Sequence, residues 1–183
     1  NKKPDGVIDG NDRTYLGSPF PGMTYGFTLG GGWKGFAVSA FFQGAFDVKY
    51  YLQGFALGSL QQPNIGNPTT IMLDAWTQAH PSDKFPRLWT TFTQNNPQNN
   101  ISSFWVRNAS YLRMKNITVS YTLPSGSLTR WGIQNLKIYY SGQNLLTARS
   151  FYKWVDPETT TGNNAYGAYP QTKINTIGID VVF

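Results

Sequence analysis

The sequence contains no cysteine, which excludes disulfide bonds and thiolate metal sites. Its single histidine, His80, stands between Ala79 and Pro81, and the chain carries no nucleophile-elbow motif that would use it in catalysis. We therefore assign no catalytic residue and expect no enzymatic activity. Charged residues make up only 13% of the chain, about half the share usual in soluble globular domains. No apolar run is long enough to form a membrane-spanning helix.

Aromatic residues and glycine are abundant instead. The chain has 12 Phe, 11 Tyr, 6 Trp and 19 Gly among its 183 residues, a composition that favours strands and turns over helices. The net charge is +6, but the basic residues are dispersed and form no stripe, so we do not expect nucleic acid as a partner. The mean hydropathy of −0.36 is compatible with a membrane barrel, whose lumen-facing positions are polar.

Alternation of apolar and polar residues predicts five strands. They cover residues 23–31, 35–51, 104–124, 134–146 and 171–183. Residues 69–78 predict a short helix. The alternation places Phe36, Phe42, Val119 and Ile179 on apolar faces. Arg113 and Lys115 break the pattern, because they fall on the apolar register of the third strand. A bulge near Asn108, or a position at the lipid headgroups, would account for them.

Short and long connections alternate between these strands. The short ones cover residues 31–35 and 125–133, and the long ones cover 52–103 and 147–170. Outer-membrane barrels alternate in this way, with short periplasmic turns and long external loops. We therefore predict an all-β fold, a transmembrane antiparallel β-barrel to which residues 1–183 contribute roughly the last five strands. This orientation places Phe183 on the periplasmic side and Asp156 outside.

The last predicted strand ends on an aromatic residue. An apolar terminal strand is an aggregation hazard in a soluble protein, whereas in a barrel its apolar face meets membrane lipid. The order of Thr176, Gly178, Val181 and Phe183 resembles the carboxyl-terminal assembly signal of bacterial outer-membrane barrels. The alternative is an ordinary core strand that ends a soluble β-domain.

The first residues match a calcium-binding loop in part. Short oxygen-bearing side chains recur at Asn1, Asp5, Asp9 and Asp12, with Gly6 at the bend and Ile8 as the apolar anchor. The match is incomplete, because Lys3 occupies a ligand position and Asp12 replaces the usual bidentate Glu. The alternative is a solvated loop rich in Asn and Asp turns. The sequence thus names Ca²⁺ as its only candidate cofactor.

Four tryptophans, Trp76, Trp89, Trp105 and Trp154, lie in or beside the long connections. Exposed aromatic faces stack on sugar rings or pack against a partner protein. The alternative is that these rings pack the loops onto one another.

Several blocks of residues follow one another in a distinctive order: DGVIDGNDRTYLGSPFP, AWTQAHP, WVRNASYLRMKNITVSYTLP, IYYSGQNLLT, DPE, YPQTK and GIDVVF. In this order they resemble the carboxyl-terminal end of a SusC/RagA-type TonB-dependent transporter of Bacteroidetes. The resemblance implies a bacterial outer-membrane importer of glycans or peptides, energised through TonB and working with a SusD-like surface lipoprotein. It also implies a plug domain, which is absent from this chain.

Two other hypotheses remain at this point. One is a soluble β-sandwich module that binds carbohydrate through calcium and aromatic side chains. It requires Phe36, Phe42, Val119 and Ile179 to pack inward against a second layer. The other is an outer-membrane barrel with a purely structural role.

Overall fold

The computed structural model describes residues 10–51, 70–88, 102–124, 126, 128–149, 155–159 and 171–183. The chain divides into two compact units. The sheet unit comprises Phe20–Val48 and Asn108–Phe183, and the loop unit comprises Asn1–Pro19 and Lys49–Arg107. Within the described ranges, no helix combines the length and the apolar character needed to cross a membrane.

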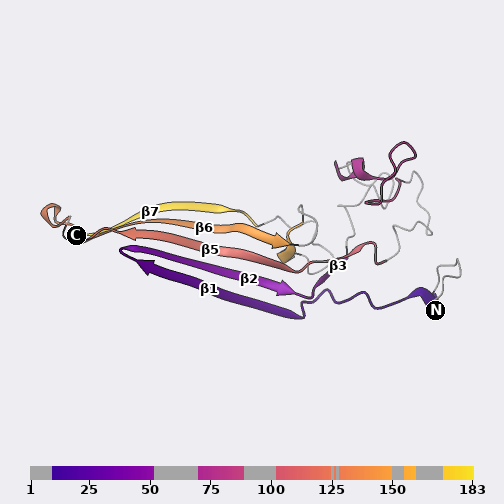
Figure 1. The fold of residues 1–183 in the computed structure, drawn as a ribbon, viewed down its shortest axis with the longest axis horizontal. Coiled ribbons are helices and arrows are strands. Elements are labelled where there is room, and N and C mark those ends of the chain that lie inside the picture. Colours follow the sequence, from indigo (N-terminus) through magenta and orange to yellow (C-terminus); the bar gives the residue numbers. More distant parts are fainter. Residues whose placement is uncertain are drawn as a thin grey trace. The chain divides into compact units, whose positions relative to one another are not determined.

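The sheet unit is built on one antiparallel sheet of five strands in the order β1-β2-β5-β6-β7 (Figure 1). The strands are β1 (Met23–Trp33), β2 (Phe36–Phe46), β5 (Tyr111–Thr122), β6 (Asn135–Arg149) and β7 (Ile174–Val182). Each strand pairs with the next strand of this sheet along the chain, so the five predicted strands lie side by side in sequence order.

The register gives this sheet two chemically different faces. Val38 of β2 is opposite both Gly31 and Val119, and Ile138 of β6 is opposite both Tyr121 and Ile179. What we call the apolar face carries Phe27, Leu29, Phe36, Val38, Phe42, Val119, Ile138, Ile177, Ile179 and Val181. The polar face carries Ser39, Gln43, Asn116, Thr118, Ser120, Ser141, Gln143 and Thr176.

The apolar side chains lie open on a single layer. Ile177 is 79% exposed, Ile179 is 65% exposed and Phe36 is 53% exposed. Phe42 is half-buried because its ring stacks on Phe27 of the same face, with the centroids 5.1 Å apart. Among the described residues of the sheet unit, no second sheet covers this face, although the β-sandwich hypothesis requires one.

A β-bulge resolves the anomaly of Arg113 and Lys115. Phe41 of β2 is opposite Asn116, but the next residue, Phe42, is opposite Met114, so Lys115 is an extra residue in β5. A one-residue insertion reverses the face of every side chain beyond it. Arg113 therefore lies on the polar face. Of our two alternatives, a bulge or a position at the lipid headgroups, the structure shows a bulge, but at Lys115 and not near Asn108.

Two of the predicted strands are interrupted. The strand expected over 35–51 ends at Phe46, because Asp47 adopts a left-handed conformation (φ 52°) that Asp tolerates better than most residues. The strand expected over 104–124 breaks at Ala109, whose N–H donates to the carbonyl oxygen of Val48. The separated pieces, β3 (Lys49–Tyr51) and β4 (Val106–Asn108), form a two-stranded sheet. The helix expected over 69–78 is the shorter 3-10 helix η3 (Thr70–Asp74).

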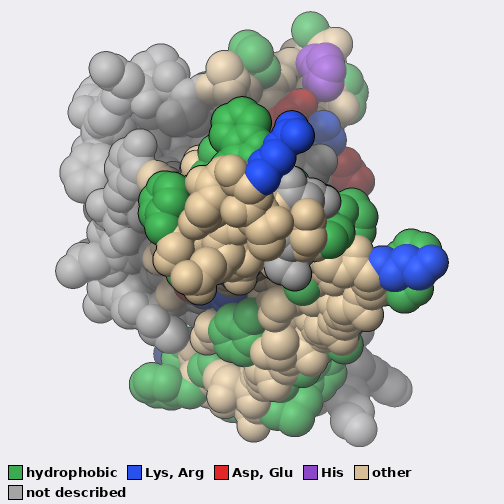
Figure 2. Space-filling view, turned by 90° about the vertical axis from the view of Figure 1, so that its left-hand side faces the viewer, with side chains coloured by type: hydrophobic (Ala, Val, Ile, Leu, Met, Phe, Trp, Pro, Cys, Tyr) green, Lys and Arg blue, Asp and Glu red, His purple; other side chains and the backbone are tan. Residues whose placement is uncertain are grey.

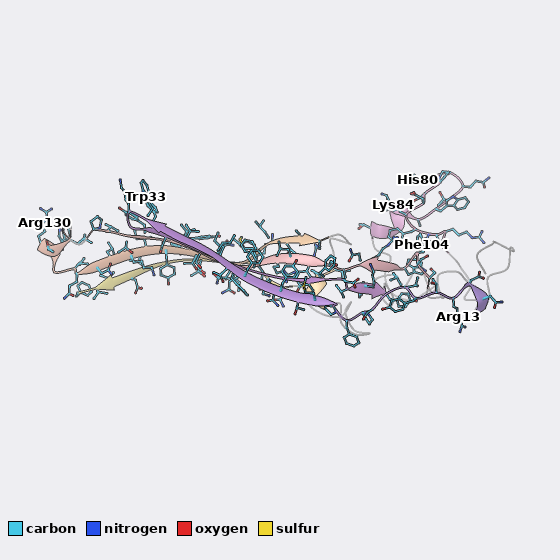
Figure 3. All side chains as sticks on the ribbon, turned by 60° about the horizontal axis from the view of Figure 1, so that its bottom comes forward. Arg13, Trp33, His80, Lys84, Phe104 and Arg130 are labelled. Carbon is cyan, nitrogen blue, oxygen red and sulfur yellow. The ribbon has the colours of Figure 1, made fainter. Side chains whose placement is uncertain are left out.

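Two connections meet at one end of the five-stranded sheet. Lys34 (φ 45°) and Gly35 (φ 88°) form the two-residue turn between β1 and β2, and both left-handed angles suit a tight hairpin. The connection between β5 and β6 contains η6 (Thr129–Trp131). Trp33 and Arg130 mark this end in Figure 3. Figure 2 looks onto the same end and shows hydrophobic and basic side chains there.

Candidate functional site

Two groups of side chains stand out beyond the sheet itself. The first is a set of charged residues in the sheet unit, which we call the anchor cluster: Arg113, Lys115, Asp156 and Glu158. Arg113 Nη2 lies 2.9 Å from Asp156 Oδ1, and Lys115 Nζ lies 3.0 Å from Glu158 Oε2. The side chains of Arg113 and Asp156 are only 3% and 5% exposed. The bulge makes this cluster, because it brings both cations of β5 to the same carboxylate, that of Glu158.

Asp156 is the central acceptor of the anchor cluster. Its Oδ1 also accepts the backbone N–H of Glu158, and its Oδ2 accepts the backbone N–H of Gln171. Burial alone would raise the pKa of Asp156, but these two N–H donors and the Arg113 guanidinium outweigh burial and hold that pKa below its usual value. Asp156 is therefore an ionised, fully engaged carboxylate at neutral pH.

The anchor cluster joins three strands to one loop segment. Arg113 Nε donates to Thr147 Oγ1 of β6, and Arg149 Nη1 donates to the carbonyl oxygen of Val155. Gln171, which Asp156 binds, leads directly into β7. The short segment that includes η7 (Pro157–Thr159) is thus fixed to β5, β6 and the start of β7.

The second group is an aromatic pocket in the loop unit, a cavity of about 470 Å³. Its lining consists of Trp76, Ser82, Asp83, Phe85, Pro86, Arg87, Ser102, Phe104 and Trp105. Trp105 is only 2% exposed and Phe85 is buried, whereas Trp76 remains 40% exposed. The rings therefore form a pocket with a buried base and one partly exposed wall.

Hydrogen bonds shape the pocket before any ligand is bound. The N–H of Trp76 donates to the carbonyl oxygen of Phe85, which closes the neck of the loop between them. Thr77 and His80 exchange backbone hydrogen bonds at the tip of this loop, where Figure 3 labels His80. In the other lining segment, residues 102–105, the rings of Phe104 and Trp105 pack edge to face with their centroids 4.8 Å apart. The pocket is thus preformed.

The structure brings two of the four predicted tryptophans, Trp76 and Trp105, into this pocket. Trp89 and Trp154 lie outside the described residues. The predicted calcium ligands Asn1, Asp5 and Asp9 also lie outside them, and Asp12 is exposed in η1 (Gly10–Asp12). Among the residues that are described, no three acidic or histidine side chains form a group suited to a metal ion.

The predicted assembly signal lies in β7 and just beyond it. Val181 is on the apolar face opposite Leu136, and Phe183 is exposed after the last strand residue. Thr176 and Gly178 are on the polar side, opposite Ser141 and Tyr139. The Tyr139 ring lies directly over Gly178 and fills the space that a β-carbon would occupy. Gly178 is therefore needed here for packing, whatever else it does.

Comparison with known proteins shows what kind of protein carries these features. No protein-family model matches the chain. The chain is 31% identical to TonB-dependent receptor P3 and 30% identical to TonB-dependent receptor P26, both of Formosa agariphila. Both alignments cover 98% of this chain, which spans 18% and 19% of the length of these curated relatives.

Solved structures of RagAB also match the chain. The RagAB peptide importer in its open-open state matches with a TM-score of 0.65 and 29% identity over 91% of this chain and 18% of that chain. A structure of the RagAB peptide transporter matches with a TM-score of 0.66 and 27% identity, over 90% and 17% of the respective chains.

The chain belongs to the SusC/RagA-type TonB-dependent receptors.

The predicted fold class is thereby confirmed. The five-stranded sheet is a portion of the transmembrane antiparallel barrel of a TonB-dependent receptor, and the β-sandwich is not the fold of this chain. In a barrel wall the apolar face meets lipid, which accounts for its exposed Ile, Leu and Phe side chains.

The blocks of sequence that resemble this family meet in the anchor cluster. Arg113 and Lys115 come from WVRNASYLRMKNITVSYTLP, Asp156 and Glu158 from DPE, and Gln171 from YPQTK. These residues were not predicted to form a site. The sequence did hold a signal for this cluster, namely Arg113 and Lys115 on an apolar register. A charge in such a position requires either a bulge or a partner of opposite charge.

Proposed function

We propose that the chain forms the carboxyl-terminal wall of an outer-membrane importer that takes up glycans or peptides together with a SusD-like surface lipoprotein. One observation carries the proposal: the sheet exposes its apolar side chains on one face and presents hydroxyl and amide side chains on the other. A sheet of this kind suits a wall between lipid and an aqueous lumen. RagAB, a solved structure to which the chain is similar, is a peptide importer, and this similarity supports import as the activity.

The plug and the segment that contacts TonB belong, in this proposal, to parts of the receptor outside this chain. The chain itself performs no catalysis. Its short turns, with Lys34 and Arg130, face the periplasm, and its long connections face the cell exterior. A calcium ion held by Asn1, Asp5, Asp9 and Asp12 is a further part of this proposal, and calorimetric titration of the full-length receptor with Ca²⁺ tests it.

Adjacent residues of β7 offer a sharp test, because Ile177 and Thr176 lie on opposite faces. Single cysteines are placed at either position in the full-length receptor, labelled with a fluorophore and reconstituted in vesicles containing brominated lipid. We expect strong quenching of the label at Ile177→Cys and weak quenching at Thr176→Cys. Equal quenching at both positions contradicts the barrel wall.

Localisation and assembly are tested on the same receptor. We expect it in the outer-membrane fraction, with gel migration that changes on heating. Recovery of the full-length, signal-bearing receptor only in the soluble fraction contradicts the proposal.

A further inference from the structure

We propose that the aromatic pocket binds an apolar side chain of a peptide, with the charged groups of the peptide held at its rim by Asp83 and Arg87. This inference deepens the proposed function and rests on it, because it chooses between the two classes of imported solute. It depends on three properties of the pocket: its lining, its remaining polar groups and its charges.

The lining favours an apolar group. Four aromatic rings and one proline supply most of the surface: Trp76, Phe85, Pro86, Phe104 and Trp105. A cavity of about 470 Å³ lies within the usual size range of small-ligand sites. It has room for one large side chain and the backbone on either side of it.

Two of the polar groups in the lining, the Ser82 hydroxyl and the Ser102 carbonyl, are already engaged. Ser82 Oγ donates to the carbonyl oxygen of Asp74 at 2.7 Å and accepts the N–H of Lys84 at 3.2 Å. The carbonyl oxygen of Ser102 accepts the N–H groups of Trp105 and Val106. A sugar ring needs several free hydrogen-bonding partners for its hydroxyl groups, and burying them unpaired is costly. The interior of this pocket therefore suits a hydrocarbon side chain better than a sugar.

Charges of both signs stand at the rim. Asp83 and Arg87 line the pocket, and both are exposed. A short peptide with free ends carries an ammonium group and a carboxylate, which complement this pair. A neutral oligosaccharide carries neither group. Charge complementarity and the apolar lining thus point to the same class of ligand.

The test uses the full-length receptor in lipid nanodiscs and isothermal titration calorimetry. The probes are the tripeptides Ala-Phe-Ala and Ala-Ser-Ala with free ends, and maltohexaose. We expect Ala-Phe-Ala to bind and the other two probes to bind at least about tenfold more weakly. Blocking both ends of Ala-Phe-Ala with acetyl and amide groups should also weaken binding. Absence of Ala-Phe-Ala binding, or equal binding of its blocked form, overturns the inference.

Two matched variants locate the binding. Trp76→Ala removes the partly exposed wall and should weaken Ala-Phe-Ala binding about tenfold. His80→Ala alters the same loop outside the lining and should leave the affinity unchanged. Equal affinity of Trp76→Ala and wild type, or maltohexaose binding that Trp76→Ala abolishes, overturns the inference.

The failure of this inference can be told apart from the failure of the proposed function. Every preparation is first tested for outer-membrane localisation and heat-modifiable migration. A correctly assembled receptor that fails the peptide tests overturns the pocket assignment alone, whereas a receptor that never enters the membrane overturns the importer.

Discussion

Arg113 and Asp156 form a buried ion pair, with 2.9 Å between Nη2 and Oδ1, across 43 residues of chain. Asp156 belongs to a loop segment and Arg113 to a strand of the barrel wall. The pair therefore holds the base of the last long connection against β5. Because both side chains are almost fully buried, the consequences of breaking it differ from those of breaking a surface ion pair.

Replacing Asp156 by alanine should strongly destabilise the receptor. The change takes the Asp156 carboxylate away from the buried Arg113 guanidinium, which keeps only Glu158 as a counter-charge, and removing one member of a buried pair costs about 3–5 kcal/mol. The measurement is the temperature at which the purified full-length receptor loses its heat-modifiable migration. Lys84→Ala is the matched control, because it removes the exposed Lys84–Asp74 pair and should cost at most about 1 kcal/mol. Equal shifts in the two variants would mean that the buried pair contributes little.

Acidification should weaken the same contact. The pKa of Asp156 is lower in the folded receptor than its ordinary value of 3.8. The stability that the ionised Asp156 carboxylate contributes is therefore fully present above the pKa of the unfolded state. It is lost as the pH falls from about 3.8 through the lower pKa of the folded state. The measurement is the unfolding temperature from pH 7 down to pH 3. We expect it to fall more steeply at the acidic end in wild type than in Asp156→Asn. Parallel curves would contradict this assignment.

Gly178→Val should impair barrel assembly through Tyr139. The added side chain occupies the space that the Tyr139 ring fills, and overpacking of this kind costs about 1–3 kcal/mol. The fraction of receptor that reaches the heat-modifiable state measures the effect. Adding Tyr139→Ala to Gly178→Val should restore part of the loss.

Gly31→Val is the control for that change. Gly31 is also a strand glycine, but no heavy atom lies within 4 Å of the position of its β-carbon, so valine should be tolerated there. A defect in Gly178→Val that Tyr139→Ala leaves unchanged would mean that Gly178 acts through the assembly machinery and not through packing.

Inserting one alanine between Met114 and Lys115 should abolish assembly, whereas Lys115→Met should not. The insertion adds a residue beside the bulge and moves Arg113 to the apolar face, where a charge in lipid costs about 2–4 kcal/mol near the middle of the bilayer. Lys115→Met keeps the bulge and removes only the ion pair with Glu158. The measurement is the outer-membrane level of each variant. Similar levels would show that the register of β5 does not depend on the number of residues at the bulge.

The two faces of the sheet could be predicted from the sequence because alternation repeats over many residues. Phe36, Val119 and Ile179 share the predicted face, and the exposure of Phe36 and Ile179 follows from it. The interruptions could not be predicted. A single left-handed residue such as Asp47 ends a strand without disturbing the pattern on either side.

The sites were less accessible to prediction than the fold. The anchor cluster depends on residues such as Arg113 and Glu158 that are far apart in the chain and have no local spacing in common. The pocket was seen only as individual tryptophans, because its loop has no periodicity that would bring Phe85 beside Trp105. In both cases long-range contacts decide the outcome, and one sequence holds little information on them.

The extra residue at Lys115 has a counterpart on the neighbouring strand, where Asn144 and Leu145 lie between the partners of Asn116 and Met114. The sheet is thereby divided into two parts, one on either side of the bulge, each with its own strand register. Inserting or replacing residues in the part next to the long connections need not change the register of the other part. Such a barrel can acquire new surface loops, in evolution or in the laboratory, while its membrane-embedded part keeps one pattern.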